Sequence, residues 1–209
     1  TVSASRGGED VSVVVGPYDV QCMLSRALAD SPNLASLPFA VHLMDQGFFD
    51  HTLGFAAGQR FGDMGSPMAY LVDCASGGSA ERRSALEDQL ADARNLLGDG
   101  LAAPFHHESC DVAEGVDLGD AFRAPFACDV PTLFVSGELD ARTPPENVEV
   151  LLEGFSQAAH VVVTNTGHDA RELESPAYCA LVQDFLAGQA VSSVTLELPP
   201  VRFRPLMDL

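Results

Sequence analysis

The last third of the chain contains two short, almost continuous apolar runs. They are TLFVS at 132–136 and HVVVT at 160–164, and runs of this length are typical of strands buried in a parallel sheet. Between them, apolar residues recur at helical spacing, namely Val148, Leu151, Leu152 and Phe155. The order strand, helix, strand predicts a right-handed crossover in which both strands run in the same direction.

Capping residues and prolines mark the helix starts in this region. Thr143 is followed by two prolines and Glu146, which is the composition of a capping box with proline in the first turn. Ser175 and Pro176 open another helix, whose apolar face carries Tyr178, Leu181, Val182 and Phe185 and which Gly188 closes. The segment SSVTLELPP after it predicts an edge strand or a packed tail. Residues 129–209 are therefore predicted to form an α/β segment.

The chain before residue 129 predicts mainly helices. GPYDVQCMLSRALADSP and SLPFAVHLM carry helical apolar stripes, and GFFDHTLGFAAG carries a weaker one. PMAYLVDC, near 67–74, predicts a short strand, and the segment from Ser79 to Gly98 predicts a long helix. We therefore expect a helical region over 17–128, preceded by a leader or linker at 1–16.

Composition and charge exclude several classes of protein. The chain has 209 residues, of which 46% are hydrophobic, and this is enough for a packed core. Its 11 basic and 30 acidic residues give a net charge of −19, which repels nucleic acids and anionic membranes. No apolar run reaches the roughly 18 residues of a membrane span, and TVSASRGGED lacks the regions of a secretion signal. We therefore expect no nucleic-acid partner and no membrane partner. Any secretion signal is expected to lie outside this sequence.

Metal and cofactor sites are not expected. The five cysteines form no C-x-x-C pair, which argues against a zinc ribbon or a thioredoxin-like redox site. HHESC, at 106–110, places two histidines beside a cysteine, but neither a fourth ligand nor a helical spacing accompanies them. The odd cysteine count leaves at least one unpaired within the chain.

An acid and a histidine follow the two predicted parallel strands. Asp140 lies four positions after Ser136, and His168 lies four positions after Thr164. Because parallel strands end at the same edge of a sheet, we expect the two side chains to meet there. A carboxylate can hold the imidazole tautomer while the imidazole acts as general base. Glu138 is a candidate for binding a substrate α-amino group, with a solvated turn carboxylate as the alternative.

The order strand, GELDARTPP, helix, strand, TGHD, helix resembles the last third of an α/β-hydrolase. DVPTLFVSGELDARTPP resembles the acid motif of the tripeptidyl-aminopeptidase and proline-iminopeptidase type, the TAP-like group. The segments YLVDCASG, ESCDV, YCALVQDFLAG and LPPVRF also resemble its C-terminal half. The resemblance implies that Asp140 and His168 are triad residues and that the helices belong to a cap over the active site. It further implies a Cys74–Cys110 disulfide and a location outside the cell or in its envelope.

The nucleophile of such an enzyme is missing from the sequence. No G-x-S-x-G motif precedes Asp140; the nearest fit is Ser76 in CASGG, where Cys74 replaces the first glycine. Thr1 as an N-terminal nucleophile is a further, weaker alternative. We therefore expect the C-terminal portion of a serine hydrolase acting on small peptides or esters, inactive alone, whose N-terminal half supplies the serine. The alternative is a catalytically silent, hydrolase-like binding or scaffold domain.

Overall fold

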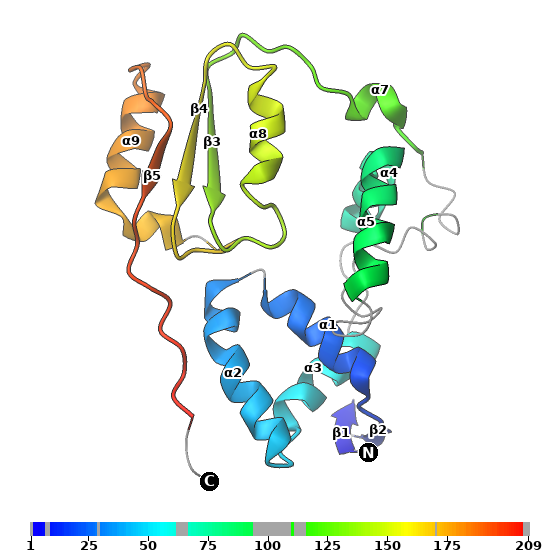
Figure 1. Ribbon diagram of the computed structural model, residues 1–209. Coiled ribbons are helices and arrows are strands. Elements are labelled where there is room, and N and C mark those ends of the chain that lie inside the picture. Colours follow the sequence, from blue (N-terminus) through cyan, green and yellow to red (C-terminus); the bar gives the residue numbers. More distant parts are fainter. Residues whose placement is uncertain are drawn as a thin grey trace. The chain divides into compact units, whose positions relative to one another are not determined.

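The computed structural model describes residues 2–6, 9–28, 30–61, 67–93, 110, 116–169 and 171–206 (Figure 1). The chain divides into two compact units. One comprises Thr1–Ser25 with Leu43–Ala124, and the other comprises Arg26–His42 with Pro125–Leu209. In the part of the chain that is described, no helix has the length and apolar character needed to cross a membrane.

The second unit is built around a parallel sheet of three strands, which confirms the predicted α/β class. The strands are β3 (Thr132–Gly137), β4 (Ala158–Val163) and β5 (Val194–Leu196), in the order β3-β4-β5. Thr132 lies opposite Ala158 and Gly137 lies opposite Val163, so β3 and β4 end level with each other. The strand β5 confirms the edge strand predicted for SSVTLELPP.

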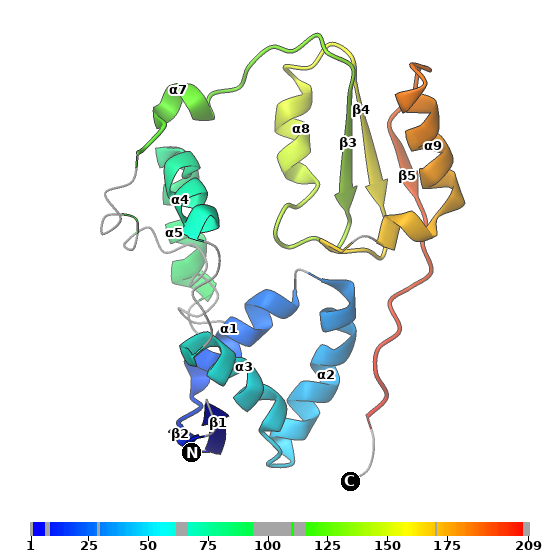
Figure 2. The same cartoon turned by 180° about the vertical axis from the view of Figure 1, so that it is seen from behind.

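The two faces of the sheet carry different helices. Val161 and Val163 are fully buried and form a core with Leu198 and with Tyr178 and Leu181 of α9 (Pro176–Leu186). On the other face, Phe134 makes an edge-to-face contact with Phe155, which follows α8 (Glu146–Leu152). Both views show α8 and α9 on either side of the strands (Figures 1 and 2).

One of the two predicted helix caps is present. Ser175 precedes α9, and its Oγ accepts a hydrogen bond from the Tyr178 amide at 3.2 Å. Thr143, by contrast, does not cap α8. This helix begins at Glu146, and Pro145 at its cap position makes no side-chain hydrogen bond to it. The Thr143 hydroxyl donates instead to the Asp140 carboxylate, and a hydrogen bond to an ionised acceptor is stronger than the hydrogen bond between neutral groups that a cap would form. A short 3-10 turn, η2 (Arg171–Glu174), precedes α9.

The remaining elements are a hairpin and a series of helices. Strands β1 (Val2–Arg6) and β2 (Glu9–Val13) pair antiparallel and lie within the segment predicted to be a leader or linker at 1–16. The helices are α1 (Pro17–Ala27), α2 (Ser31–Asp45), α3 (Asp50–Phe61), α4 (Pro67–Ser76), α5 (Ala80–Ala93) and α7 (Gly119–Arg123). Helix α2 crosses the boundary between the units.

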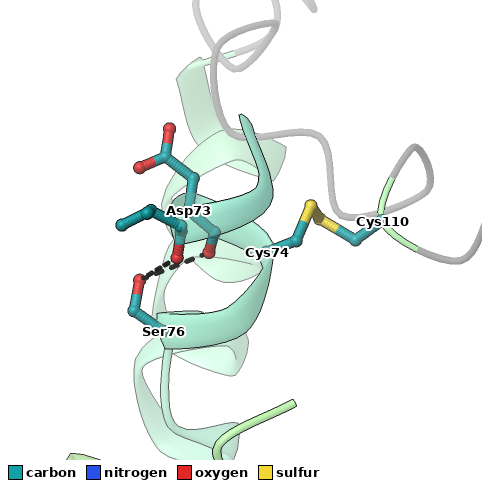
Figure 3. The surroundings of a disulfide bond; sticks show 5 residues. Asp73, Cys74, Ser76 and Cys110 are labelled. Carbon is teal, nitrogen blue, oxygen red and sulfur yellow. Dashed lines mark hydrogen bonds between the residues drawn. A yellow bond between two sulfur atoms is a disulfide. The ribbon is translucent and has the colours of Figure 1, made fainter. Parts of the chain in front are cut away.

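Helix α4 replaces the strand predicted near 67–74. Pro67 occupies its first position, where proline costs no hydrogen bond, and a short apolar run does not by itself distinguish a helix from a strand. Cys74 on this helix forms a disulfide with Cys110, with 5.4 Å between the Cα atoms (Figure 3). The pairing implied by the family resemblance is thus confirmed, and in the described part of the chain Cys22, Cys128 and Cys179 form no disulfide.

Candidate active site

Asp140 and His168 lie in contact at the C-terminal edge of the sheet. His168 Nδ1 is 2.9 Å from Asp140 Oδ2 across a separation of 28 positions in the sequence. The level ends of β3 and β4 bring them together, since each residue sits in the loop that follows one of these strands. Asp140 is buried, with 5% of its side chain exposed, whereas the His168 side chain is 39% exposed. The carboxylate is thus shielded while the imidazole is accessible.

Backbone contacts hold the two loops against each other. The amide of Glu138 donates to the Val163 carbonyl, and the amide of Leu139 donates to the Thr166 carbonyl, both at 2.9 Å. Gly137 permits this approach, because a Cβ at this position would lie closer than 3.0 Å to the carbonyl oxygens of Thr166 and Gly167. The separation between Asp140 and His168 therefore depends on a residue without a side chain.

The carboxylate of Asp140 accepts hydrogen bonds at both oxygens. Oδ1 accepts from the amides of Arg142 and Thr143 at 2.8 and 2.9 Å, and Oδ2 accepts from the Thr143 hydroxyl at 2.6 Å as well as contacting His168. Burial by itself raises the pKa of Asp140, but the hydrogen bonds from Thr143, His168 and Arg142 outweigh it and lower the pKa below its ordinary value. Asp140 is therefore ionised at neutral pH.

The contact with Asp140 favours one form of the neutral imidazole. A carboxylate is an acceptor only, so Nδ1 carries the proton and Nε2 keeps a lone pair that can accept one. Thr143 Oγ1 also lies 3.2 Å from Nδ1. Sequence reasoning assigned Thr143 to helix capping and missed this role. Its position three residues after a strand-end acid was the signal that pointed to it.

Glu138 belongs to a neighbouring pocket. Its Oε2 accepts a hydrogen bond from the Asn165 amide at 3.2 Å. The pocket has a volume of about 350 Å³ and is lined by Glu138, Thr164, Asn165, Glu197, Leu198 and Pro200. Neither Asp140 nor His168 lines it, so the structure does not group Glu138 with the acid and histidine.

The other candidates from the sequence are not supported as site residues. Ser76 is the last residue of α4, and its Oγ donates to the Val72 carbonyl of the same helix at 2.9 Å (Figure 3). This is ordinary helix geometry, unlike the strained strand-to-helix turn of a hydrolase nucleophile. Thr1, His106 and His107 lie outside the described residues. Among those described, no group of three or more His, Cys, Asp or Glu is arranged to hold a metal ion.

A serine–histidine contact lies inside the sheet. His160 Nε2 is 2.9 Å from Ser136 Oγ, and the two residues are only 8% and 6% exposed. They lie on regular strands, β4 and β3, and no substrate reaches a hydroxyl buried between a sheet and a helix. We therefore interpret the pair as a hydrogen-bonded part of the core.

The buried imidazole of His160 makes stability depend on pH. Burial lowers the pKa of His160 below its ordinary value of 6.5, and the Glu149 carboxylate opposes this only in part. Unfolded chains then bind more protons than folded ones below about pH 6.5, so the free energy of unfolding is expected to fall as the pH drops from about 7 to about 5. His160→Gln should flatten this dependence, measured by urea unfolding at several pH values. Equal slopes in the two proteins would contradict the prediction.

A comparison with known protein families agrees with this architecture. Residues 108–192 match the model of an α/β-hydrolase family, and the match includes β3, β4, α9 and both Asp140 and His168. The family is described as TAP-like protein, and the match supports the C-terminal portion of a TAP-like α/β-hydrolase over this segment. No curated protein and no solved structure matches the chain.

Proposed function

We propose that the chain is the C-terminal portion of a peptidase-like serine hydrolase and carries its acid and histidine. The observation that supports this is the 2.9 Å contact between a buried carboxylate and an accessible imidazole at the ends of two parallel strands. In this proposal, the N-terminal half of a longer chain supplies the nucleophilic serine and the oxyanion donors. The reaction needs no cofactor.

The proposed mechanism uses His168 as the base and Asp140 as the group that orients it. Nε2 of His168 takes the proton of the serine hydroxyl as its oxygen attacks the carbonyl carbon of an amide or ester. Asp140 remains ionised and stabilises the imidazolium through Nδ1. The imidazolium then gives its proton to the leaving amine or alcohol, and His168 activates a water that cleaves the acyl-enzyme.

Further observations support the longer chain and its substrates. Within the described residues, β3 is an edge strand of the sheet, and the unpaired backbone groups of an edge strand can pair with a further strand. We propose that the missing half continues the sheet there. Glu138 and its pocket are proposed to bind the α-amino group of a small peptide. The Cys74–Cys110 disulfide supports a location outside the cell or in its envelope, where disulfides persist.

Labelling of the catalytic serine tests this proposal. The 209-residue chain is expected to show neither turnover of aminoacyl-nitroanilides nor covalent labelling by a fluorophosphonate, because it lacks the nucleophile. The chain extended by its upstream coding sequence is expected to show both, with the label on a G-x-S-x-G serine.

Two results would contradict the proposal. Turnover by the 209-residue chain that survives Ser76→Ala and is abolished by His168→Ala would place the nucleophile within this sequence. Failure of the extended chain to react would favour the alternative, a hydrolase-like binding or scaffold domain.

A further inference from the structure

Helix α2 begins against the loop that carries His168. Ser31, its first residue, is only 2% exposed. Its Oγ accepts a hydrogen bond from the Gly167 amide at 2.8 Å and donates one to Asp169 Oδ1 at 2.9 Å. Both views show the start of α2 beside the loop that follows β4 (Figures 1 and 2). The residues on either side of His168 are thus bound to a hydroxyl more than a hundred positions earlier.

Asp169 adds further contacts to this arrangement. Its Oδ1 also accepts from the Gly167 amide at 2.9 Å and, more weakly, from the Ser31 amide at 3.4 Å. Burial by itself raises the pKa of Asp169, but the hydrogen bonds from Ser31 and Gly167 outweigh it, so the pKa is lowered. The ionised carboxylate lies at the start of α2, where the helix dipole favours a negative charge.

The imidazole depends on this support because its own contacts are few. His168 is 39% exposed, and its Nδ1 contacts only Asp140 and Thr143 among the hydrogen bonds within the described residues. The direction of the ring therefore follows from the backbone on either side of it. A shift of about 1 Å in a catalytic group can cost about a hundredfold in rate.

We propose that Ser31 and Asp169 are positioning residues that hold the backbone of His168 so that its Nδ1 faces Asp140, an inference that rests on the proposed function. Neither residue touches the reacting atoms. The pair fastens the helical segment that begins at Ser31 to the catalytic histidine. Sequence reasoning placed 17–128 in a cap-like region and assigned no role to Ser31 or to Asp169.

Removal of the Ser31 hydroxyl tests the inference on the chain itself. In Ser31→Ala, hydrogen exchange of the Gly167 amide, followed by NMR, is expected to accelerate at least about fivefold, because one of its two acceptors is lost. The imidazole nitrogen shifts of His168 are expected to change from the Nδ1–H tautomer to a mixture of both tautomers. Ser31→Thr keeps the hydroxyl and should restore both readouts.

Ser36→Ala is the matched control. Ser36 lies on the same helix, and its Oγ donates to the Pro32 carbonyl of that helix, so neither readout should change. If Ser31→Ala does not fold, Asp169→Asn replaces it. The Asn side chain keeps one acceptor but loses the charge, so Gly167 exchange should accelerate by a smaller factor, and no change would overturn the inference.

Asp140→Asn separates failure of the inference from failure of the proposed function. If Asp140→Asn alters the His168 tautomer while Ser31→Ala alters neither readout, the Asp140–His168 pair stands and the inference is overturned. If Asp140→Asn leaves the tautomer unchanged, the pair does not form in solution, and both the proposed function and the inference are overturned. Altered readouts in both variants, with rescue by Ser31→Thr, support the inference.

Discussion

In the complete hydrolase that we propose, Asp140→Asn is expected to lower kcat by about 10³–10⁴-fold, with little change in KM. The Asn amide can donate to Nδ1, which drives the proton of the neutral imidazole onto Nε2 and removes the base. The four contacts that hold the carboxylate leave it no room to turn away. The measurement is steady-state kinetics on an aminoacyl-nitroanilide over the pH range of activity.

Asp184→Asn is a suitable control for this substitution. Asp184 lies on the exposed side of α9, so the same chemical change there should leave kcat within about twofold of the original. The double variant of Asp140→Asn with His168→Ala should be no slower than His168→Ala alone, because the two residues act as a unit. A loss below tenfold in a folded Asp140→Asn protein would show that the carboxylate does not orient the base.

Gly137→Ala is expected to lower the free energy of unfolding by about 1–3 kcal/mol, the range typical of overpacked positions. The added methyl group would overlap the backbone carbonyls of Thr166 and Gly167, and backbone atoms do not rotate away as a side chain does. Relief of the overlap must separate the two loops, so activity should fall as well. Urea unfolding followed by circular dichroism gives the stability, and kinetics give the activity.

Gly54→Ala provides the comparison for Gly137→Ala. Gly54 lies within α3, and a Cβ there meets no atom within 4 Å. The same change should therefore be neutral or stabilising by up to about 1 kcal/mol, because alanine favours the helix. If Gly137→Ala unfolded at the same urea concentration as the original protein, the close approach of the two loops would be wrong.

The α/β segment was predictable because its signals are local. Apolar runs of strand length, a helical stripe between them and the handedness of crossovers determine that β3 and β4 are parallel. The contact between Asp140 and His168 follows from that one rule, although the residues are far apart in the sequence. The Cys74–Cys110 disulfide came from the family resemblance alone.

Other features were not predictable for identifiable reasons. The helix near 67–74 was not predictable, because a short apolar run fits the period of a helix as well as that of a strand. Only the surroundings of the segment decide between them. Thr143 has the sequence of a helix cap, yet its hydroxyl binds Asp140 because the carboxylate lies within reach. Ser31 and Asp169 show no pattern at all, since their contact joins elements more than a hundred positions apart.

The sequence by itself determined the class of the C-terminal unit, the acid and the histidine, because strand period and strand direction depend on neighbouring residues. Only the tertiary structure decided which groups hold them: Thr143 on the carboxylate, Gly137 between the loops, and Ser31 with Asp169 beside the imidazole. Hydrogen bonds of this kind form only when two segments are placed relative to each other to within a few tenths of an ångström. No local pattern specifies such distances.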